Sequence, residues 1–197
     1  MRPREPKPLR PGGLRPIAWA LAATLALAGP ALPQPPRSTD AVQLNRYAPD
    51  TKPPGFRGRT VAGHLVSLAE IRGRVVLLNF WATWCLECRP EMPALERLHR
   101  ELTPQGLTVM GVNVREDVTA VRDYARELGL TFTLVLDLNG DISKTYGVIG
   151  IPTTFLIGRD GRAVALAVGP RAWDGAPARE ILRVLLAEPA PPSPGTP

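Results

Sequence analysis

Cysteine and histidine are scarce in this chain. Its 197 residues include two cysteines, Cys85 and Cys88, and two histidines, His64 and His99. A zinc site built on the cysteines would need two more ligands, and only these histidines could supply them. His99 stands inside a helical pattern between two arginines, and we interpret it as a solvated surface residue. We therefore expect no metal and no cofactor.

Positive charge is also sparse once the first 15 residues are set aside. The net charge is +6 and the pI is near 10.0. Five basic residues and one acidic residue stand in positions 1–15, whereas the other 182 residues carry 19 basic and 17 acidic side chains. A basic surface for nucleic acid would need its charge on the folded domain. We expect no nucleic-acid partner.

The chain has no long hydrophobic run. Residues 1–33 form a basic leader followed by an Ala/Leu-rich stretch, whose uninterrupted apolar part covers residues 17–28. This pattern is typical of an export signal, and the stretch is shorter than the ~20 residues that span a bilayer. Ala26-Leu27-Ala28 offers a cleavage site, but the basic region is long and Pro30 follows closely. A cleaved signal peptide and a retained membrane anchor both stay open. Either one places the remaining chain outside the cytoplasm, in the periplasm or on the outer face of the membrane.

Proline is concentrated at the two ends. Most of the 23 prolines lie in the first 55 and last 10 residues. Residues 34–55 show no hydrophobic period and are interpreted as a Pro-rich tether, and residues 189–197 as a disordered tail. The length leaves room for one domain, at residues 56–188. We find no internal repeat.

Within that domain, strand-like and helix-like hydrophobic patterns alternate. The expected elements are a hairpin at 59–68, a short capped helix at 67–71, strands at 75–80, 107–114, 132–136, 153–157 and 163–168, and helices at 91–102, 118–128, 142–146 and 180–188. This alternation, ending in a hairpin and a helix, predicts an α/β fold with a central mixed sheet flanked by helices. The last strand should be antiparallel.

The two cysteines fall between a buried strand and a helix. The strand ends near residue 80 and we expect the helix to begin near Cys88, so Cys85 lies at or just before a helix N-terminus. Unpaired backbone N–H groups and the helix dipole favour a thiolate there. A thiolate is the species that attacks a disulfide. Cys85 is therefore the predicted attacking sulfur and Cys88 the resolving one.

Other interpretations of the pair fit less well. A structural disulfide would close only a four-residue loop and so remove little unfolded-state entropy. Extracytoplasmic copper carriers use a CxxxC spacing and a distant histidine, whereas the spacing in this chain is CxxC. A peroxiredoxin places threonine two intervening residues before its cysteine, whereas Thr83 is one residue nearer. Metal or peroxide chemistry stays open as a minor alternative.

Several motifs together resemble the TlpA/ResA branch of the thioredoxin-like proteins. They are NFWATWCLEC at residues 79–88, EMP at 91–93 and GIPTTFLI at 150–157, with entry motifs at 48–50 and 67–77. The likeness covers residues 48–188. It implies a thioredoxin-like fold with the family's N-terminal extension and a central insertion at about 114–136.

The resemblance also implies roles for individual residues. Pro152 matches the family's cis-proline, which packs opposite the cysteines and leaves the backbone of Ile151 free to pair with a substrate strand. Trp84 would cover the disulfide, although it is equally well described as a partly buried aromatic residue. Pro93 matches a proline that bends the active-site helix.

An acidic residue near the sulfurs is a further implication. Glu91 stands where such proteins place a carboxylate that raises the cysteine pKa and moves a proton, although a glutamate there could instead only stabilise the helix dipole. Asn79 replaces the buried aspartate of thioredoxin. Glu87, between the cysteines, departs from the family's usual proline and favours a reducing pair, since its charge opposes the thiolate.

The expected function is an extracytoplasmic thiol-disulfide oxidoreductase. It would reduce disulfides in client proteins, with the haem-attachment cysteines of apocytochrome c as one possibility, and would be re-reduced by a membrane thiol-disulfide electron donor. The alternative is a thioredoxin-like module that binds a partner, or carries a metal such as copper, without redox turnover. If the apolar segment is retained, the membrane is a further partner.

Overall fold

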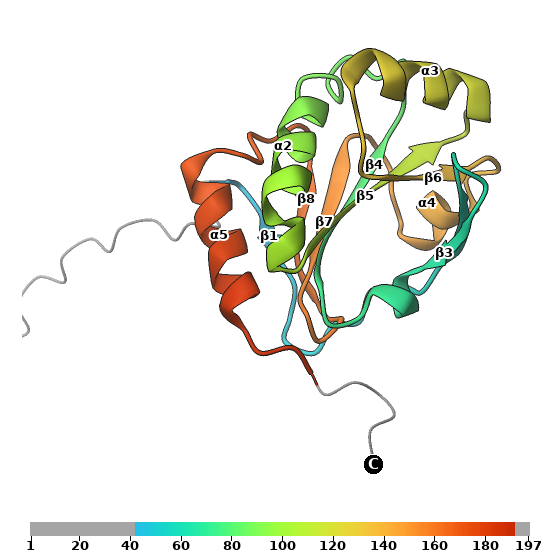
Figure 1. Ribbon diagram of the computed structural model, residues 1–197. Helices are drawn as coiled ribbons and strands as arrows, with labels where there is room; N and C mark the ends of the chain where they lie inside the picture. The colour runs from blue at the N-terminus through green and yellow to red at the C-terminus, as the bar shows by residue number, and fades with distance from the viewer. Residues whose placement is uncertain (1–41, 192–197) are drawn as a thin grey trace, which may run out of the picture. The chain divides into compact units, whose positions relative to one another are not determined.

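An eight-stranded mixed sheet forms the centre of the folded part of the chain (Figure 1). The computed structural model describes residues 42–191, so the predicted leader, residues 34–41 of the tether and residues 192–197 of the tail lie outside the described residues. The strand order is β1-β8-β7-β4-β5-β6-β2-β3. The strands are β1 Asn45–Arg46, β2 Arg57–Thr60, β3 Leu65–Ser67, β4 Val75–Trp81, β5 Leu107–Val114, β6 Thr133–Asp137, β7 Thr153–Ile157 and β8 Ala163–Val168.

Helices cover both faces of this sheet. They are the short η1 Leu68–Ile71 and η2 Thr103–Gln105, and α2 Met92–Leu102, α3 Val118–Leu128, α4 Asp141–Thr145 and α5 Ala176–Ala187. The β4–β5 and β5–β6 pairs are parallel, and every other pair in the sheet is antiparallel. None of the helices within residues 42–191 is long and apolar enough to cross a bilayer.

Strand β4 is buried along its whole length and divides the core in two. Successive side chains of a strand point to opposite faces of the sheet. Val75, Leu77 and Trp81 therefore join the core under α2, α3 and α5, whereas Val76, Leu78 and Phe80 join the core under α4. Figure 1 shows α2 and α5 side by side on one face. Asn79 shares the face of Leu77 and Trp81, which points it toward the start of α2.

The predicted architecture is confirmed, with most element bounds within one or two residues. The exception among the helices is α5, which begins at Ala176 rather than at 180. Pro177 occupies the first turn of α5, where backbone N–H groups make no hydrogen bond within the helix, so proline is tolerated there. The helix therefore starts before the apolar residues from which we predicted its position. The segment predicted as a central insertion, 114–136, holds α3 and most of β6, which widens the sheet beyond β5.

Part of the predicted tether belongs to the folded domain. The side chains of Val42 and Leu44 are buried, and β1 pairs with β8 at one edge of the sheet. Strand β1 has only two residues, too few to give a period-two pattern. The sequence pattern therefore could not reveal β1, whose extended conformation depends on its pairing with β8.

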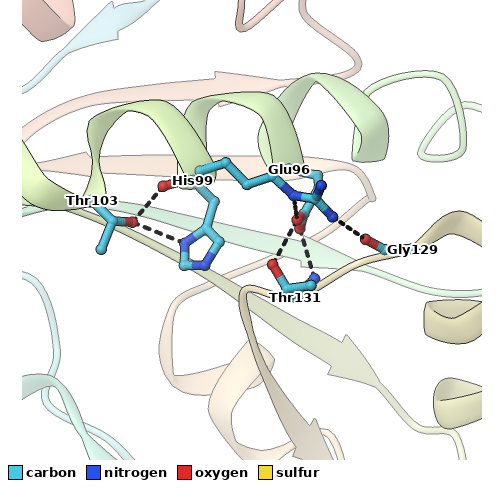
Figure 2. Close-up of polar contacts among 6 residues, drawn as sticks. Glu96, His99, Thr103, Gly129 and Thr131 are labelled. Atoms are coloured by element: carbon cyan, nitrogen blue, oxygen red, sulfur yellow. Dashed lines mark hydrogen bonds and ion pairs between the residues drawn. The ribbon is translucent and has the colours of Figure 1, made fainter.

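Helix α2, which follows the cysteines, is fixed to the segment before β6 by a buried carboxylate (Figure 2). Glu96 accepts hydrogen bonds from the backbone N–H of Thr131 (2.7 Å), from its hydroxyl (2.6 Å) and from Arg100 (2.5 Å). Burial works to raise the pKa of Glu96, but the Thr131 and Arg100 hydrogen bonds outweigh it and hold that pKa below its usual value. The helix is thereby anchored about one turn beyond the site.

His99 is not the solvated residue that we expected. Its ring lies edge-on to Phe132 at 6.3 Å between centroids, and its Nδ1 lies 3.1 Å from the Thr103 hydroxyl (Figure 2). The stripe on α2 that includes His99 therefore packs on the segment leading into β6. Neighbouring arginines suggested exposure, whereas the side chain itself is partly buried.

Candidate functional site

Cys85 and Cys88 are joined by a disulfide at the end of β4. The S–S distance is 2.04 Å. Residue Cys85 keeps 6% of its surface exposed and residue Cys88 keeps none. Of the two sulfurs, Cys85 is the one that a second protein could reach, which agrees with its predicted attacking role.

The chain around the disulfide is a series of tight turns rather than a helix. The N–H groups of Cys85, Cys88 and Glu91 each donate to the carbonyl three residues earlier. Regular helix begins only at Met92, so our prediction of a helix starting near Cys88 is wrong. Pro90 and Pro93 lack the N–H groups that would bond to residues 86 and 89, which delays the helical ladder.

The turn still provides a donor to the attacking sulfur. The N–H of Cys88 points at the Cys85 Sγ, 3.1 Å away. A hydrogen bond of this kind favours a thiolate over a thiol. The stabilisation expected from a helix N-terminus is therefore supplied by a single turn. Pro93 sits within the first turn of α2, where its missing N–H interrupts no hydrogen bond inside the helix.

Glu91 is buried beside this turn, with 2% of its surface exposed. Its Oε1 accepts from the side-chain amide of Asn79 (2.7 Å) and its Oε2 from the backbone N–H of Arg171 (3.2 Å). Asn79 also donates to the hydroxyl of Thr154 (2.9 Å), two residues after Pro152. One hydrogen-bonded chain thus joins the cysteine turn, β4 and the proline segment.

Burial changes the acidity of Glu91. Removal from water raises its pKa to about 7, against smaller lowering effects of the hydrogen bonds from Arg171 and Asn79. Its carboxylate makes no capping hydrogen bond to α2. The geometry therefore does not favour the alternative in which Glu91 only stabilises the helix dipole. A carboxyl that titrates near neutral pH is suited to accept and return a proton.

A second carboxylate, which the sequence analysis did not select, holds the segment before Cys85. Glu116 accepts from the N–H of Thr83 (2.7 Å), from the Thr83 hydroxyl and from the side-chain amide of Asn113 (2.6 Å). Asn113 and Glu116 lie at the carboxyl end of β5, parallel and adjacent to β4. Polar residues just past neighbouring parallel strands meet at one edge of a sheet, and that signal could have found Glu116.

The proline segment lies beside the strand that leads to the cysteines, because Phe80 of β4 pairs with Thr153 of β7. The Ile151–Pro152 peptide bond is cis. Among the residues that the structure describes, neither the N–H nor the carbonyl of Ile151 has a hydrogen-bond partner. Its backbone is therefore available to another chain.

Two large apolar side chains next to the disulfide are exposed. Trp84 is 65% exposed and Leu86 86% exposed, although both are large hydrophobic residues. Trp84 and Ile151 line the same groove. Trp84 is thus exposed, whereas we had described it as a partly buried aromatic residue. Within residues 42–191 no group of three or more metal-ligating side chains is clustered.

Known proteins similar to this chain share both the fold and the motif region. Residues 45–165 match the model of the AhpC/TSA family. Thiol-disulfide oxidoreductase ResA of Geobacillus kaustophilus is 37% identical over 129 residues, which cover 66% of this chain and 71% of the relative. ResA of Bacillus thuringiensis is 36% identical over 111 residues, and the match spans 64% of its length, slightly less than two thirds.

Solved structures give the same result. A putative thiol:disulfide interchange protein DsbE from Chlorobium tepidum superposes with a TM-score of 0.66 at 30% identity, covering 73% of this chain and 99% of that one. StoA from Bacillus subtilis gives 0.56 at 28% identity, covering 66% and 96%. The fold is therefore thioredoxin-like, and the chain belongs to the AhpC/TSA family, in which it is similar to the ResA thiol-disulfide oxidoreductases.

Proposed function

We propose that this protein is an extracytoplasmic thiol-disulfide oxidoreductase that reduces disulfides in client proteins. The observation that carries the proposal is a disulfide whose less buried sulfur, Cys85, accepts a backbone N–H and lies next to two exposed apolar side chains. Attack on a disulfide needs an accessible thiolate and room for a second chain beside it. The names of the ResA and DsbE relatives support the same chemistry.

The reaction exchanges two electrons in two steps. In the reduced protein the Cys85 thiolate attacks one sulfur of a client disulfide, forming a mixed disulfide and releasing the other client sulfur as a thiolate. Cys88, once deprotonated, attacks the Cys85 sulfur and releases the second client thiolate. The client is reduced and the Cys85–Cys88 disulfide is formed. A membrane thiol-disulfide donor would restore the dithiol.

Glu91 is proposed as the group that handles the proton of Cys88. It lies three residues after Cys88, and its N–H bonds to the Cys88 carbonyl. Because the pKa of Glu91 is about 7, it is a competent base and a competent acid near neutral pH. Trp84 and the backbone of Ile151 are proposed to contact the client, with Pro152 holding that segment in place.

The surrounding charges favour reduction as the working direction. Glu87 lies between the cysteines, while Glu91 and Glu116 flank them, and the carboxylates oppose thiolate formation once they are ionised. A less stabilised thiolate makes the dithiol a better reductant. Clients could include apocytochrome c, whose haem-attachment cysteines must be reduced before haem is joined to them.

Reduction of insulin is the direct test of turnover. With dithiothreitol as the electron source, catalytic amounts of the protein should accelerate the precipitation of reduced insulin chains, because Cys85 delivers electrons faster than the small thiol alone. A module that only binds a partner or a metal would leave the uncatalysed rate unchanged. That outcome would refute the proposed activity, provided that the protein's own disulfide had been reduced.

The extracytoplasmic location rests on the sequence of residues 1–33. Basic residues before a short apolar run should keep the N-terminus in the cytoplasm and export the rest. Alkaline phosphatase fused after Pro189 should therefore be active in cells, since it folds only outside the cytoplasm. An active β-galactosidase at that position would contradict the assignment.

A further inference from the structure

A groove beside the disulfide carries charges that the proposed chemistry does not use. It has a volume of about 520 Å³ and lies between the cysteine turn and α4. Its lining includes Trp84, Arg115, Lys144, Ile149 and Ile151. Because Trp84 directly precedes Cys85 and Ile151 precedes Pro152, a client whose disulfide meets Cys85 would extend into this groove.

One part of the groove is apolar and open. Ile149 is 98% exposed and Trp84 65% exposed, whereas side chains of this size are usually covered. Exposed apolar residues that gather in one place mark a contact surface. Aromatic residues are also enriched in the centres of protein interfaces. This part of the groove fits a large apolar side chain.

The charged residues that line the groove are both cations. Arg115 and Lys144 are exposed, and neither side chain makes a hydrogen bond or ion pair within the part of the chain that the structure describes. The Arg115 guanidinium packs on the backbone of Gly140: a Cβ there would lie 2.5 Å from its Nε. Glycine at position 140 therefore makes room for the guanidinium at the start of α4.

Within the described residues, no carboxylate forms an ion pair with either cation. Glu116 already accepts hydrogen bonds from Thr83 and Asn113, and Asp137 accepts from the N–H groups of Ile142 (2.9 Å) and Ser143 (2.8 Å). Asp141 and Glu87 are exposed and are not among the residues that line the groove. The groove thus offers two unpaired cations next to an apolar wall.

We propose that this groove selects client segments in which an aspartate or glutamate stands near the reactive cysteine, beside a large apolar residue. The apolar side chain would rest against Trp84 and Ile149, and the carboxylate would pair with Lys144 and Arg115. A guanidinium binds carboxylate in a two-pronged geometry, and charge complementarity speeds encounter as well as selecting the partner. The proposal deepens the oxidoreductase function and rests on it for its role in the cell.

Binding can be measured without turnover. Three ten-residue peptides, identical except for two positions that are Glu, Gln or Lys, would carry leucine beside serine in place of the reactive cysteine. Calorimetric titration into the full protein should show the Glu peptide binding about tenfold more tightly than the Lys peptide. The preference should shrink in Arg115→Gln and Lys144→Gln, and vanish in Lys144→Glu, because the new carboxylate offsets the charge of Arg115. It should also weaken as salt is added.

Lys52→Gln is the matched control. Lys52 is also an exposed lysine, but it borders a different pocket, with Val76 near the start of β4 and away from the cysteines at its end. The control should keep the full preference, because only the protein's total charge has changed. Equal binding of the three peptides to the wild type, or an equal loss in Lys52→Gln and Lys144→Gln, would overturn the proposal.

Disulfide-bonded versions of the same peptides separate this proposal from the oxidoreductase function. Faster reduction of the Glu peptide, together with its tighter binding, supports both. Selective binding with no reduction of any peptide keeps the groove assignment and contradicts the activity. Reduction of all three peptides at one rate, with no selective binding, keeps the activity and contradicts the groove assignment.

Discussion

Replacing Cys88 with serine should leave the protein covalently attached to its clients. Cys85 would still attack, but no second thiol would release the mixed disulfide. Replacing Cys85 should trap few clients and reduce insulin turnover to the uncatalysed rate, a loss on the order of 10³-fold or more as expected for removal of a nucleophile. Non-reducing gels of cell extracts, combined with the insulin assay, measure both effects.

The exposure of the two sulfurs is the physical reason for this asymmetry. Cys85 is 6% exposed and Cys88 is fully buried, so a client sulfur can approach only the first. The double serine variant is the control for adducts through other groups, since it has no cysteine left. If Cys85→Ser trapped clients and Cys88→Ser did not, the roles of the sulfurs would be reversed.

Replacing Glu91 with glutamine should stabilise the protein at neutral and alkaline pH. Folding raises the pKa of this carboxyl from 4.5 to about 7, so the folded state holds the proton more tightly. The contribution of Glu91 to the stability of the wild type is therefore greatest below pH 4.5, and it falls as the pH rises to about 7. The full difference is about 3 kcal/mol at most. Glutamine has no proton to lose and should escape that fall.

The hydrogen-bonding groups around residue 91 tolerate the amide. The Asn79 Oδ1 has no hydrogen-bond partner, so a rotated Asn79 amide could accept from the new NH₂ group while the carbonyl still accepts from Arg171. Urea unfolding of both proteins at pH 4 and pH 8 measures the difference. Glu87→Gln is the control, because it removes one carboxylate from a nearby residue that is exposed rather than buried. A Glu91→Gln protein that is less stable at pH 8 would contradict the predicted cost of the buried charge.

The same variant separates charge from proton transfer. Loss of a neighbouring negative charge should lower the pKa of Cys85 in the reduced protein, which the ultraviolet absorbance of the thiolate reports. Disulfide exchange should nevertheless slow near pH 7, because Cys88 has lost its proton acceptor. An unchanged cysteine pKa together with an unchanged exchange rate would mean that Glu91 does not act on the sulfurs.

The sequence predicted the scaffold more completely than the contacts within the site. Strand β4 could be predicted because a short run of β-branched and apolar residues is typical of a buried strand. Helix α3 could be predicted because its apolar residues recur at helical spacing and end at Gly129, which takes a positive φ of 62°. The Asn79–Glu91 and Glu116–Thr83 contacts depend on how β4, β5 and the cysteine turn are placed side by side. Such distant pairings leave no periodic signal in a single sequence.

The start of the active-site helix shows a different limitation. Apolar spacing placed the helix correctly, but Pro90 and Pro93 decide where its hydrogen-bonded ladder begins, and that lies four residues after Cys88. The consequence for function is small, since the Cys88 N–H still reaches the Cys85 sulfur. The Cys85 thiolate is thus stabilised by the N–H of one turn rather than by the N-terminus of a helix.

The redox potential of the Cys85–Cys88 couple tests the central claim most directly. The protein would be equilibrated with defined ratios of reduced and oxidised dithiothreitol, and the dithiol fraction counted by thiol alkylation and mass. We predict a reversible two-electron transition nearer the value of thioredoxin, about −270 mV, than that of the oxidant DsbA, about −120 mV. A disulfide that is reduced only on unfolding, or a potential near the DsbA value, would contradict the assignment of a reducing thiol-disulfide oxidoreductase.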